Sequence, residues 1–177
     1  MKVLITGAAG FIGSHLCERL LTDGSMVVGL DNFDDFYDPR IKRRNIESCI
    51  RNKNFKLIEA DIRDSAAMDK AVGSGVEIIV HLAAKAGVRP SIEKPLLYAD
   101  VNINGTMVLL DSAKKHKVKN IKSTSSSSAQ ARASMATIKR FPFLKMTTLI
   151  SQSRLTPQPK RPASLSATHI ITFTAFP

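Results

Sequence analysis

Apolar and polar positions along the first two thirds of the chain alternate between two patterns. Short apolar runs such as Lys2–Thr6 and Met26–Asp31 predict buried strands, whereas the spacing of apolar residues in Phe11–Thr22 predicts a helix. Strands that alternate with helices form a parallel sheet with helices on both faces, so we predict an α/β, doubly wound fold. The expected strands are Lys2–Thr6, Met26–Asp31, Phe55–Ala60 and Glu77–Ala84, and the expected helices are Phe11–Thr22, Ile41–Ile50, Ala66–Val72 and Leu96–Lys115.

Three glycines with the spacing G-x-x-G-x-x-G, Gly7, Gly10 and Gly13, follow the first strand directly. A strand, a glycine turn and a helix N-terminus together form a binding site for the pyrophosphate of a dinucleotide. The glycines permit a sharp turn, the approach of backbone N–H groups to the phosphates, and close packing of the helix. We therefore predict that Gly7, Gly10, Phe11 and Ile12 bind the cofactor; the alternative is a purely structural turn.

Further candidates come at the ends of two predicted strands. Asp31 ends the second strand, about 20 residues beyond the glycines, where a carboxylate accepts hydrogen bonds from ribose hydroxyls and repels the 2′-phosphate of NADP. It therefore favours NAD, although it can also initiate a turn before Asn32. Leu82, Ala83 and Ala84 end the fourth strand, at the sheet edge where ligands bind, and core packing is their alternative role.

Charge is distributed unevenly along the 177 residues. The net charge is +11, but all 15 Asp and Glu residues lie in 1–120, beside 18 Lys and Arg. Residues 121–177 contain no acid, carry a charge of +8, and hold five of the eight prolines. We predict an ordered domain over 1–120 and an irregular, poorly packed tail over 121–177. Charge without interleaved aromatic residues or a known motif does not predict a nucleic-acid partner.

The remaining composition favours a cytoplasmic protein. Cys17 lies in a helical apolar pattern and Cys49 in a basic helix, and their spacing matches no metal site. Two lone cysteines are typical of a reducing compartment. No apolar run is long enough to span a membrane, and the N-terminal run is interrupted by glycine, so we expect neither a membrane span nor a signal peptide.

Five motifs together give the first two thirds of the chain a specific resemblance. They are Thr6–Gly13, Asp31–Pro39, Asp61–Asp64, His81–Arg89 and Asn102–Thr106. With these motifs, residues 1–120 resemble the extended short-chain dehydrogenase/reductase superfamily, and most closely its UDP-glucuronate 4-epimerase-like members. The resemblance implies a Rossmann-type sheet, NAD as cofactor, a nucleotide-sugar substrate, and a homodimer in the intact proteins. It also implies a second, substrate-selecting domain, which we expect to be absent from a truncated chain.

The resemblance extends the list of cofactor residues. It implies that Asn32, Asp61, Ile62 and Asn102 lie at the cofactor, with Asp61 near the adenine. The activity it implies is C4 epimerisation of the sugar through a 4-keto intermediate. A Tyr-x-x-x-Lys pair supplies the base, because the Lys lowers the pKa of the Tyr.

This catalytic pair is missing. The chain has two tyrosines, Tyr37 and Tyr98, and the residues four positions later are Ile41 and Asn102 instead of Lys. We therefore assign no catalytic residue, and we expect the chain to bind NAD weakly or not at all and not to turn over.

A shifted reading frame explains the tail. If the last base of each codon is read with the first two of the next, 129–136 permits Ser-Ser-Ser-Ser-Val-Tyr-Gly, which the family has at its Ser-rich strand end. Residues 136–147 permit Asn-Asn-Lys-Lys-Val-Pro-Phe-Ser-Glu-Asp-Asp, and 152–164 permits Ile-Ser-Pro-Tyr-Ala-Ala-Thr-Lys-Lys-Ala-Gly-Glu. The last stretch restores the missing pair, in order and at the expected distance. We predict an insertion or deletion between codons 121 and 128; the alternative is a genuine basic tail.

Other readings of the function remain open. Within the enzyme class, a sugar-nucleotide 4,6-dehydratase has a similar cofactor half. A non-catalytic NAD-binding module with a basic interaction tail is a second alternative, and a tail that binds nucleic acid is a third.

Several polar residues carry weaker expectations. Lys85 and Arg89 either reach the nicotinamide ribose or an anionic substrate, or are solvated. We expect His81 to be structural. The basic cluster Arg40, Lys42, Arg43 and Arg44 predicts a solvated helix face.

Overall fold

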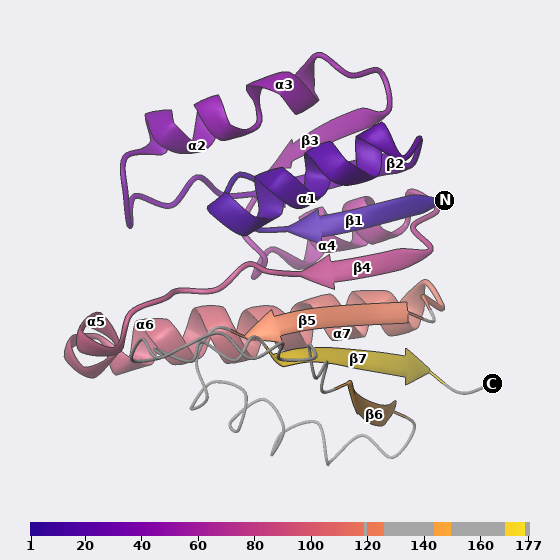
Figure 1. Ribbon diagram of the computed structural model, residues 1–177. Coiled ribbons are helices and arrows are strands. Elements are labelled where there is room, and N and C mark those ends of the chain that lie inside the picture. Colours follow the sequence, from indigo (N-terminus) through magenta and orange to yellow (C-terminus); the bar gives the residue numbers. More distant parts are fainter. Residues whose placement is uncertain (119, 126–143, 150–168, 176–177) are drawn as a thin grey trace, which may run out of the picture.

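A parallel sheet forms the centre of the protein. The computed structural model describes residues 1–118, 120–125, 144–149 and 169–175. Five strands pair in parallel in the order β3-β2-β1-β4-β5 (Figure 1), which confirms the predicted doubly wound fold. They are β1 (Lys2–Thr6), β2 (Met26–Asp31), β3 (Phe55–Glu59), β4 (Ile78–His81) and β5 (Asn120–Ser125).

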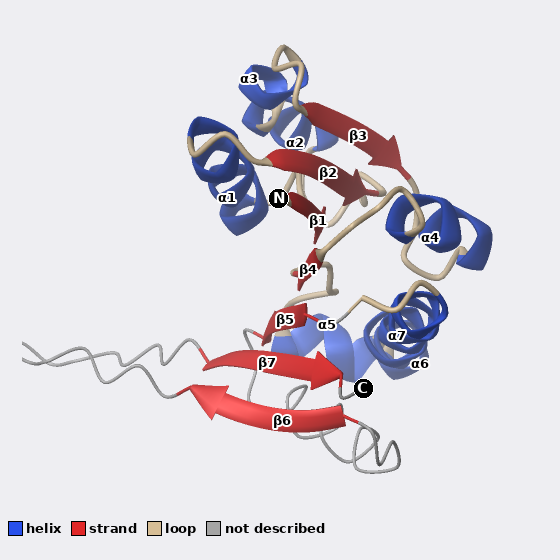
Figure 2. Ribbon diagram, turned by 90° about the vertical axis from the view of Figure 1, so that its right-hand side faces the viewer, coloured by secondary structure: helices blue, strands red, loops and turns tan. Residues whose placement is uncertain are grey.

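Helices cover both faces of this sheet (Figure 2). On one face lie α1 (Phe11–Thr22), α2 (Pro39–Asn45) and α3 (Glu47–Ile50), and on the other lie α4 (Ser65–Val72), α6 (Pro95–Ala99), the π-helical turn η1 (Asp100–Asn104) and α7 (Gly105–Lys115). A short helix, α5 (Val88–Glu93), follows the loop after β4. The strand order reverses direction between β1 and β4, which opens a crevice at the carboxyl edge of the sheet.

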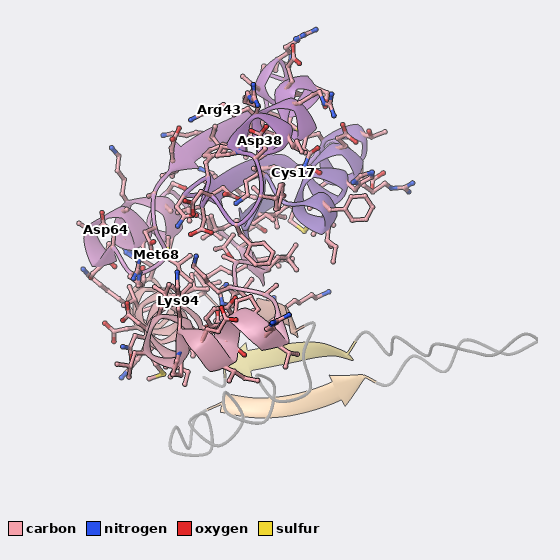
Figure 3. The ribbon with its side chains drawn as sticks, turned by 90° about the vertical axis from the view of Figure 1, so that its left-hand side faces the viewer. Cys17, Asp38, Arg43, Asp64, Met68 and Lys94 are labelled. Atoms are coloured by element: carbon pink, nitrogen blue, oxygen red, sulfur yellow. The ribbon has the colours of Figure 1, made fainter. Side chains whose placement is uncertain are left out.

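The core consists of two apolar clusters, one on each face. Alternate residues of β1 divide between them: Val3 and Ile5 pack toward α1, and Leu4 packs toward α4 and α7. Figure 3 shows Cys17 of α1 and Met68 of α4 on opposite sides of the sheet. Complete burial of one such side chain contributes about 1.5–3 kcal/mol, so the clusters hold the strands and the crevice in place.

Two predicted helices differ in detail from the observed ones. The helix expected over 41–50 is divided at Ile46, and α2 begins earlier because the Asp38 carboxylate accepts a 2.9 Å hydrogen bond from the Arg40 amide. The long helix expected over 96–115 is observed, but η1 widens its second turn. The sequence did not predict α5, which follows Gly87 at φ 101°.

The sheet continues past the predicted boundary at residue 120. Ile121 and Ser123 of β5 are in register with Ile79 and His81 of β4, so the start of the expected tail belongs to the sheet. Two further strands, which the sequence did not predict, pair antiparallel: β7 (His169–Ala175) with β5, and β6 (Leu144–Leu149) with β7. Most of the shifted-frame stretches fall outside the described residues.

Both cysteines are free and buried in the cluster that faces α1. Burial is the main cause that raises the pKa of Cys17 to about 12, and the neighbouring Cys49 adds to it. Both thiols are therefore protonated at neutral pH. Within the described part of the chain, no group of side chains could hold a metal ion, and no helix has the length and apolar character needed to cross a membrane.

Replacement of Gly13 by Ala tests the packing of α1 against the turn before it. A Cβ atom at Gly13 would lie 2.1 Å from the backbone oxygen of Gly7, and backbone cannot rotate away as a side chain can. We expect a loss of about 3 kcal/mol or more in the free energy of unfolding, measured in urea. Arg19→Ala in the same helix removes only an exposed ion pair and should change it by less than about 0.5 kcal/mol. A Gly13→Ala protein as stable as Arg19→Ala would contradict this packing.

Candidate dinucleotide-binding site

A cavity of about 410 Å³ lies at the carboxyl edge of the sheet, within the size range of small-molecule sites. It is lined by the β1–α1 turn and by the residues that end β2, β3 and β4. Nine of the twelve predicted cofactor residues line it: Gly7, Gly10, Asp31, Asn32, Asp61, Ile62, Leu82, Ala83 and Ala84. Residues distant in sequence therefore meet in one site, as the edge rule for parallel sheets requires.

The glycine turn forms the floor of this cavity. Gly7 has φ +71°, and a Cβ atom there would lie 2.8 Å from the backbone nitrogen of Ala83. Gly10 begins α1 without a side-chain cap, and the first turn of the helix contains no acid. The first backbone N–H groups of α1 are thus available to an anion, which the helix dipole also attracts.

Phe11 and Ile12 lie outside the cavity lining. The two residues are 75% and 58% exposed, at the start of α1. The predicted contact of Phe11 and Ile12 with the cofactor stays a prediction.

The Asp31 carboxylate is buried and held by two backbone amides. It accepts hydrogen bonds of 3.0 Å from the Ala9 amide in the glycine turn and 2.9 Å from the Phe33 amide. Each carboxylate oxygen has further lone-pair capacity for a hydroxyl donor. The same contacts make the turn after β1 and the end of β2 one rigid unit.

Lys42 corrects the prediction of a solvated basic cluster. Its side chain is only 10% exposed, its Nζ atom lies 3.7 Å from an Asp31 oxygen and 5.2 Å from the centre of the Tyr37 ring, and it lines the cavity. Arg40, Arg43 and Arg44 of the same helix are exposed, as expected. The fixed Asp31 carboxylate pairs with the single lysine of α2, and the charge run in the sequence gave no sign that this cation differs from the three arginines beside it.

The end of β3 contributes a saturated carboxylate. Asp61 accepts hydrogen bonds from the Asn32 amide at 3.0 Å and from the Arg63 guanidinium at 2.9 and 2.8 Å. The Arg63 hydrogen bond is the main cause that lowers the pKa of Asp61 to about 2. Arg63 also reaches Asp100 of η1 at 2.6 Å, so it joins the β3 edge to the helices on the far face. Arg63 lines the cavity and was not predicted as a site residue.

Asn102 holds the loop after β4 from behind the cavity lining. Its side-chain amide accepts from the Lys85 backbone N–H at 2.8 Å and donates to the Lys85 carbonyl at 3.1 Å. The Tyr98 hydroxyl donates to the Ala86 carbonyl at 2.6 Å. The structure thus gives Asn102 a supporting position, and the π-helical turn that carries it is a feature frequent at functional sites.

Lys85 and Asp34 form an ion pair between two loops that line the cavity. The Lys85 Nζ atom lies 2.8 Å from an Asp34 oxygen. Partial burial opposes ionisation of Asp34, but the hydrogen bonds from Lys85 and from the Phe36 amide hold its pKa below the usual value. Arg89, in contrast, is exposed and pairs with Glu93 at 3.7 Å, outside the cavity lining.

The two tyrosines are unsuited to act as a base. Burial, followed by the charge of Asp31, raises the pKa of Tyr37, whereas a phenolate base needs a lowered value. Tyr98 is buried, and its hydroxyl is engaged by the Ala86 carbonyl. That neither residue is catalytic stays a prediction.

A glycine turn at a helix N-terminus, a carboxylate at the end of β2 and a cavity at the strand-order switch define a dinucleotide-binding domain of the Rossmann type. At Gly7 a side chain has no room because the backbone of Leu82 and Ala83 lies against it, so this glycine lets the turn approach the end of β4 closely. The chain belongs to the GDP-mannose 4,6 dehydratase family, whose model matches residues 4–131.

Similar proteins support the predicted resemblance to nucleotide-sugar epimerases. A probable UDP-glucuronate 4-epimerase of Rhizobium meliloti is 43% identical over 129 residues, which are 72% of this chain and 38% of the relative. A UDP-glucuronate 4-epimerase of Thermodesulfobacterium geofontis is 40% identical over 129 residues, which are 72% of this chain and 40% of the relative. The chain therefore spans about two fifths of the length of these relatives.

Solved structures show the same likeness. UDP-glucuronic acid 4-epimerase of Bacillus cereus, in complex with UDP-glucuronic acid and NAD, has a TM-score of 0.60 and 41% identity over 64% of this chain and 36% of its own. UDP-glucose 4-epimerase of Bifidobacterium longum, in complex with NAD⁺ and UDP, has a TM-score of 0.67 and 28% identity over 81% of this chain and 50% of its own.

Burial of His81 makes the stability of the protein depend on pH. Desolvation lowers the pKa of His81 from 6.5 to about 4, so the unfolded chain binds a proton that the folded chain does not bind between these values. Stability is therefore complete above pH 6.5 and declines toward pH 4. We expect urea unfolding to show a loss of about 2 kcal/mol from pH 7 to pH 5.

His81→Asn should remove most of this loss, because no ring remains to titrate. His15→Asn replaces an exposed histidine and should retain it. An equal loss in all three proteins would show that His81 is not the group responsible.

Proposed function

We propose that this chain is the cofactor-binding half of an NAD-dependent UDP-sugar 4-epimerase, with UDP-glucuronate as the sugar nucleotide. The observation that carries the proposal is the cavity in which the glycine turn and Asp31 meet the ends of β3 and β4. Family membership and relatives named UDP-glucuronate 4-epimerase at about 40% identity support the same reaction class.

The described residues suit the parts of NAD in order along the sheet edge. The backbone of Gly7 and Gly10, with the first amides of α1, receives the pyrophosphate. Asp31 receives the adenosine ribose, and Asp61 with Ile62 borders the adenine. Leu82, Ala83 and Ala84 border the nicotinamide half. Bound NAD supplies reversible hydride transfer at C4 of the sugar, and the protein supplies placement.

The proposal includes no turnover by this chain alone. A base at the sugar hydroxyl is required for C4 oxidation, and the only two tyrosines, Tyr37 and Tyr98, do not supply one. We attribute this to a shifted reading frame, so that 1–120 is the NAD-binding domain and most of 121–177 is not the product of the family's frame. The absence of Asp and Glu from 121–177 and the family match that ends at 131 support this division.

A 4,6-dehydratase is the second candidate, because the matching family model is described by that reaction. The two activities share C4 oxidation, and they separate in the product: an epimer in one case, a 4-keto-6-deoxy sugar in the other. The relatives named as 4-epimerases favour epimerisation.

Cofactor choice tests the role of Asp31. Asp31→Asn removes the charge that opposes a 2′-phosphate, so we expect the ratio of Kd values for NADP and NAD to fall by about tenfold or more. Titration calorimetry with both dinucleotides measures the ratio, and circular dichroism checks that the variant folds. Asp35→Asn, an exposed residue of the same loop outside the cavity lining, is the matched control. An unchanged ratio in the Asp31 variant would remove Asp31 from the ribose site.

Restoration of the reading frame tests the activity. A gene repaired between codons 121 and 128 should yield C4 epimerisation of UDP-glucuronate, detected by separation of the product epimers, whereas the present chain should yield none. Replacement of the restored Tyr of Tyr-x-x-x-Lys by Phe should abolish it. If the shifted frame of the gene does not spell Ser-Pro-Tyr-Ala-Ala-Thr-Lys, the frame hypothesis is wrong and the tail is a genuine part of the protein.

A further inference from the structure

A network of buried and partly buried hydrogen bonds joins β1, β4 and α7. The Thr6 hydroxyl of β1 lies 2.7 Å from His81 Nδ1, and His81 Nε2 lies 3.0 Å from the Thr106 hydroxyl of α7. The Thr106 hydroxyl donates to the backbone carbonyl of Asn102 at 2.7 Å. At the other end, the Thr6 oxygen accepts the backbone N–H groups of Leu82 and Ala83, each at 3.2 Å.

The proton positions in this hydrogen-bond network follow from counting donors and acceptors. The Asn102 carbonyl cannot donate, so the single proton of Thr106 is directed to it, and the Thr106 oxygen accepts from His81 Nε2–H. Nδ1 of His81 is then unprotonated and accepts the proton of the Thr6 hydroxyl. With that proton engaged, the Thr6 oxygen remains free to accept both backbone amides. Every polar group of this hydrogen-bond network has a partner in this arrangement.

The opposite tautomer leaves one group unsatisfied. If Nδ1 of His81 carried the proton, it would donate to the Thr6 hydroxyl. All three hydrogen-bond partners of that hydroxyl would then be donors. The Thr6 hydroxyl proton would have no acceptor among them, in a side chain that is 0% exposed. An unsatisfied buried donor costs about 1–3 kcal/mol, which is enough to select the Nε2–H tautomer.

The hydrogen-bond network supports the cavity where the glycine turn meets the residues after β4. Leu82 and Ala83 line the cavity, and their backbone lies so close to Gly7 that a Cβ atom there would be 2.8 Å from the Ala83 nitrogen. Past the end of β4 at His81, the Ala83 amide donates to the Thr6 hydroxyl, and the Leu82 amide is shared between this hydroxyl at 3.2 Å and the Thr6 backbone carbonyl at 3.1 Å. A shift of either residue would alter the distance between this edge and the glycine turn.

We propose that His81, as the neutral Nε2–H tautomer, is a positioning residue of the dinucleotide site. It holds the Thr6 hydroxyl in the orientation that fixes Leu82 and Ala83 against the glycine turn, and it links this edge to Thr106 at the start of α7. The expected effect on cofactor affinity rests on the proposed NAD-binding function; the expected tautomer does not.

The first measurement is the protonation of the two ring nitrogens in the full chain at neutral pH, by NMR with ¹⁵N-labelled histidine. We expect a proton on Nε2 of His81 and none on Nδ1. A proton on Nδ1, or rapid exchange between the two tautomers, would overturn the proposal without any variant having to fold.

The second measurement compares variants in NAD affinity by titration calorimetry. Thr106→Val, which removes the acceptor for Nε2–H, and His81→Leu, which removes both bonds, should raise the Kd for NAD by roughly tenfold. Thr106→Ser retains the hydroxyl and should stay within about threefold of the wild-type Kd. Unchanged affinity in folded Thr106→Val and His81→Leu proteins would overturn the positioning role.

Hydrogen exchange separates this proposal from the proposed function. If the wild-type chain has no measurable affinity for NAD, the proposed function fails, and the positioning role is then decided by the amide exchange of Leu82 and Ala83. We expect the Ala83 amide to exchange faster in Thr106→Val and His81→Leu than in the wild type and in Thr106→Ser. The Leu82 amide keeps its bond to the Thr6 backbone carbonyl and should change less. Equal exchange in all four proteins would overturn the role of His81.

Discussion

The close contact between the glycine turn and its two neighbours is the constraint on which the structure depends. Gly13 brings α1 so near the turn that a Cβ atom would lie 2.1 Å from the Gly7 oxygen, and Gly7 meets the backbone of Ala83. These approaches set the position of the helix N-terminus relative to the ends of β1 and β4. Gly7 and Gly13 permit this packing, and the glycine turn leaves backbone N–H groups at the open sheet edge where the cavity lies.

Periodicity predicted the elements that this constraint requires. The bounds of β1, β2 and α1 match those expected from the sequence. Short continuous apolar runs are typical of strands buried on both faces, and the apolar residues of 11–22 repeat on one face of a helix. Asp31 was found for the same reason, because it ends a recognisable strand and a parallel sheet brings strand ends to one edge. Asp61 was predicted from the family resemblance, and the structure places it at the same edge.

Interactions between elements could not be predicted in this way. Lys42 is buried because Asp31 lies fixed nearby, and Asn102 faces the Lys85 backbone because η1 widens the helix there. The role of His81 depends on Thr6 and Thr106, which are 75 and 25 residues away along the chain. Single polar residues within apolar patterns carry no sign of such distant partners, so the sequence alone described His81 only as structural.

The contrast between the two parts of the chain also has a physical basis. The cofactor side of the cavity is stabilised by acids, with Asp31, Asp34 and Asp61 each fixed by an amide or a cation. Residues 121–177 contain no Asp or Glu, so the tail has no side-chain carboxylate with which to build similar networks. The described residues thus form a dinucleotide site, whereas the proposed epimerisation needs in addition a Tyr-x-x-x-Lys pair, which the 177 residues do not contain.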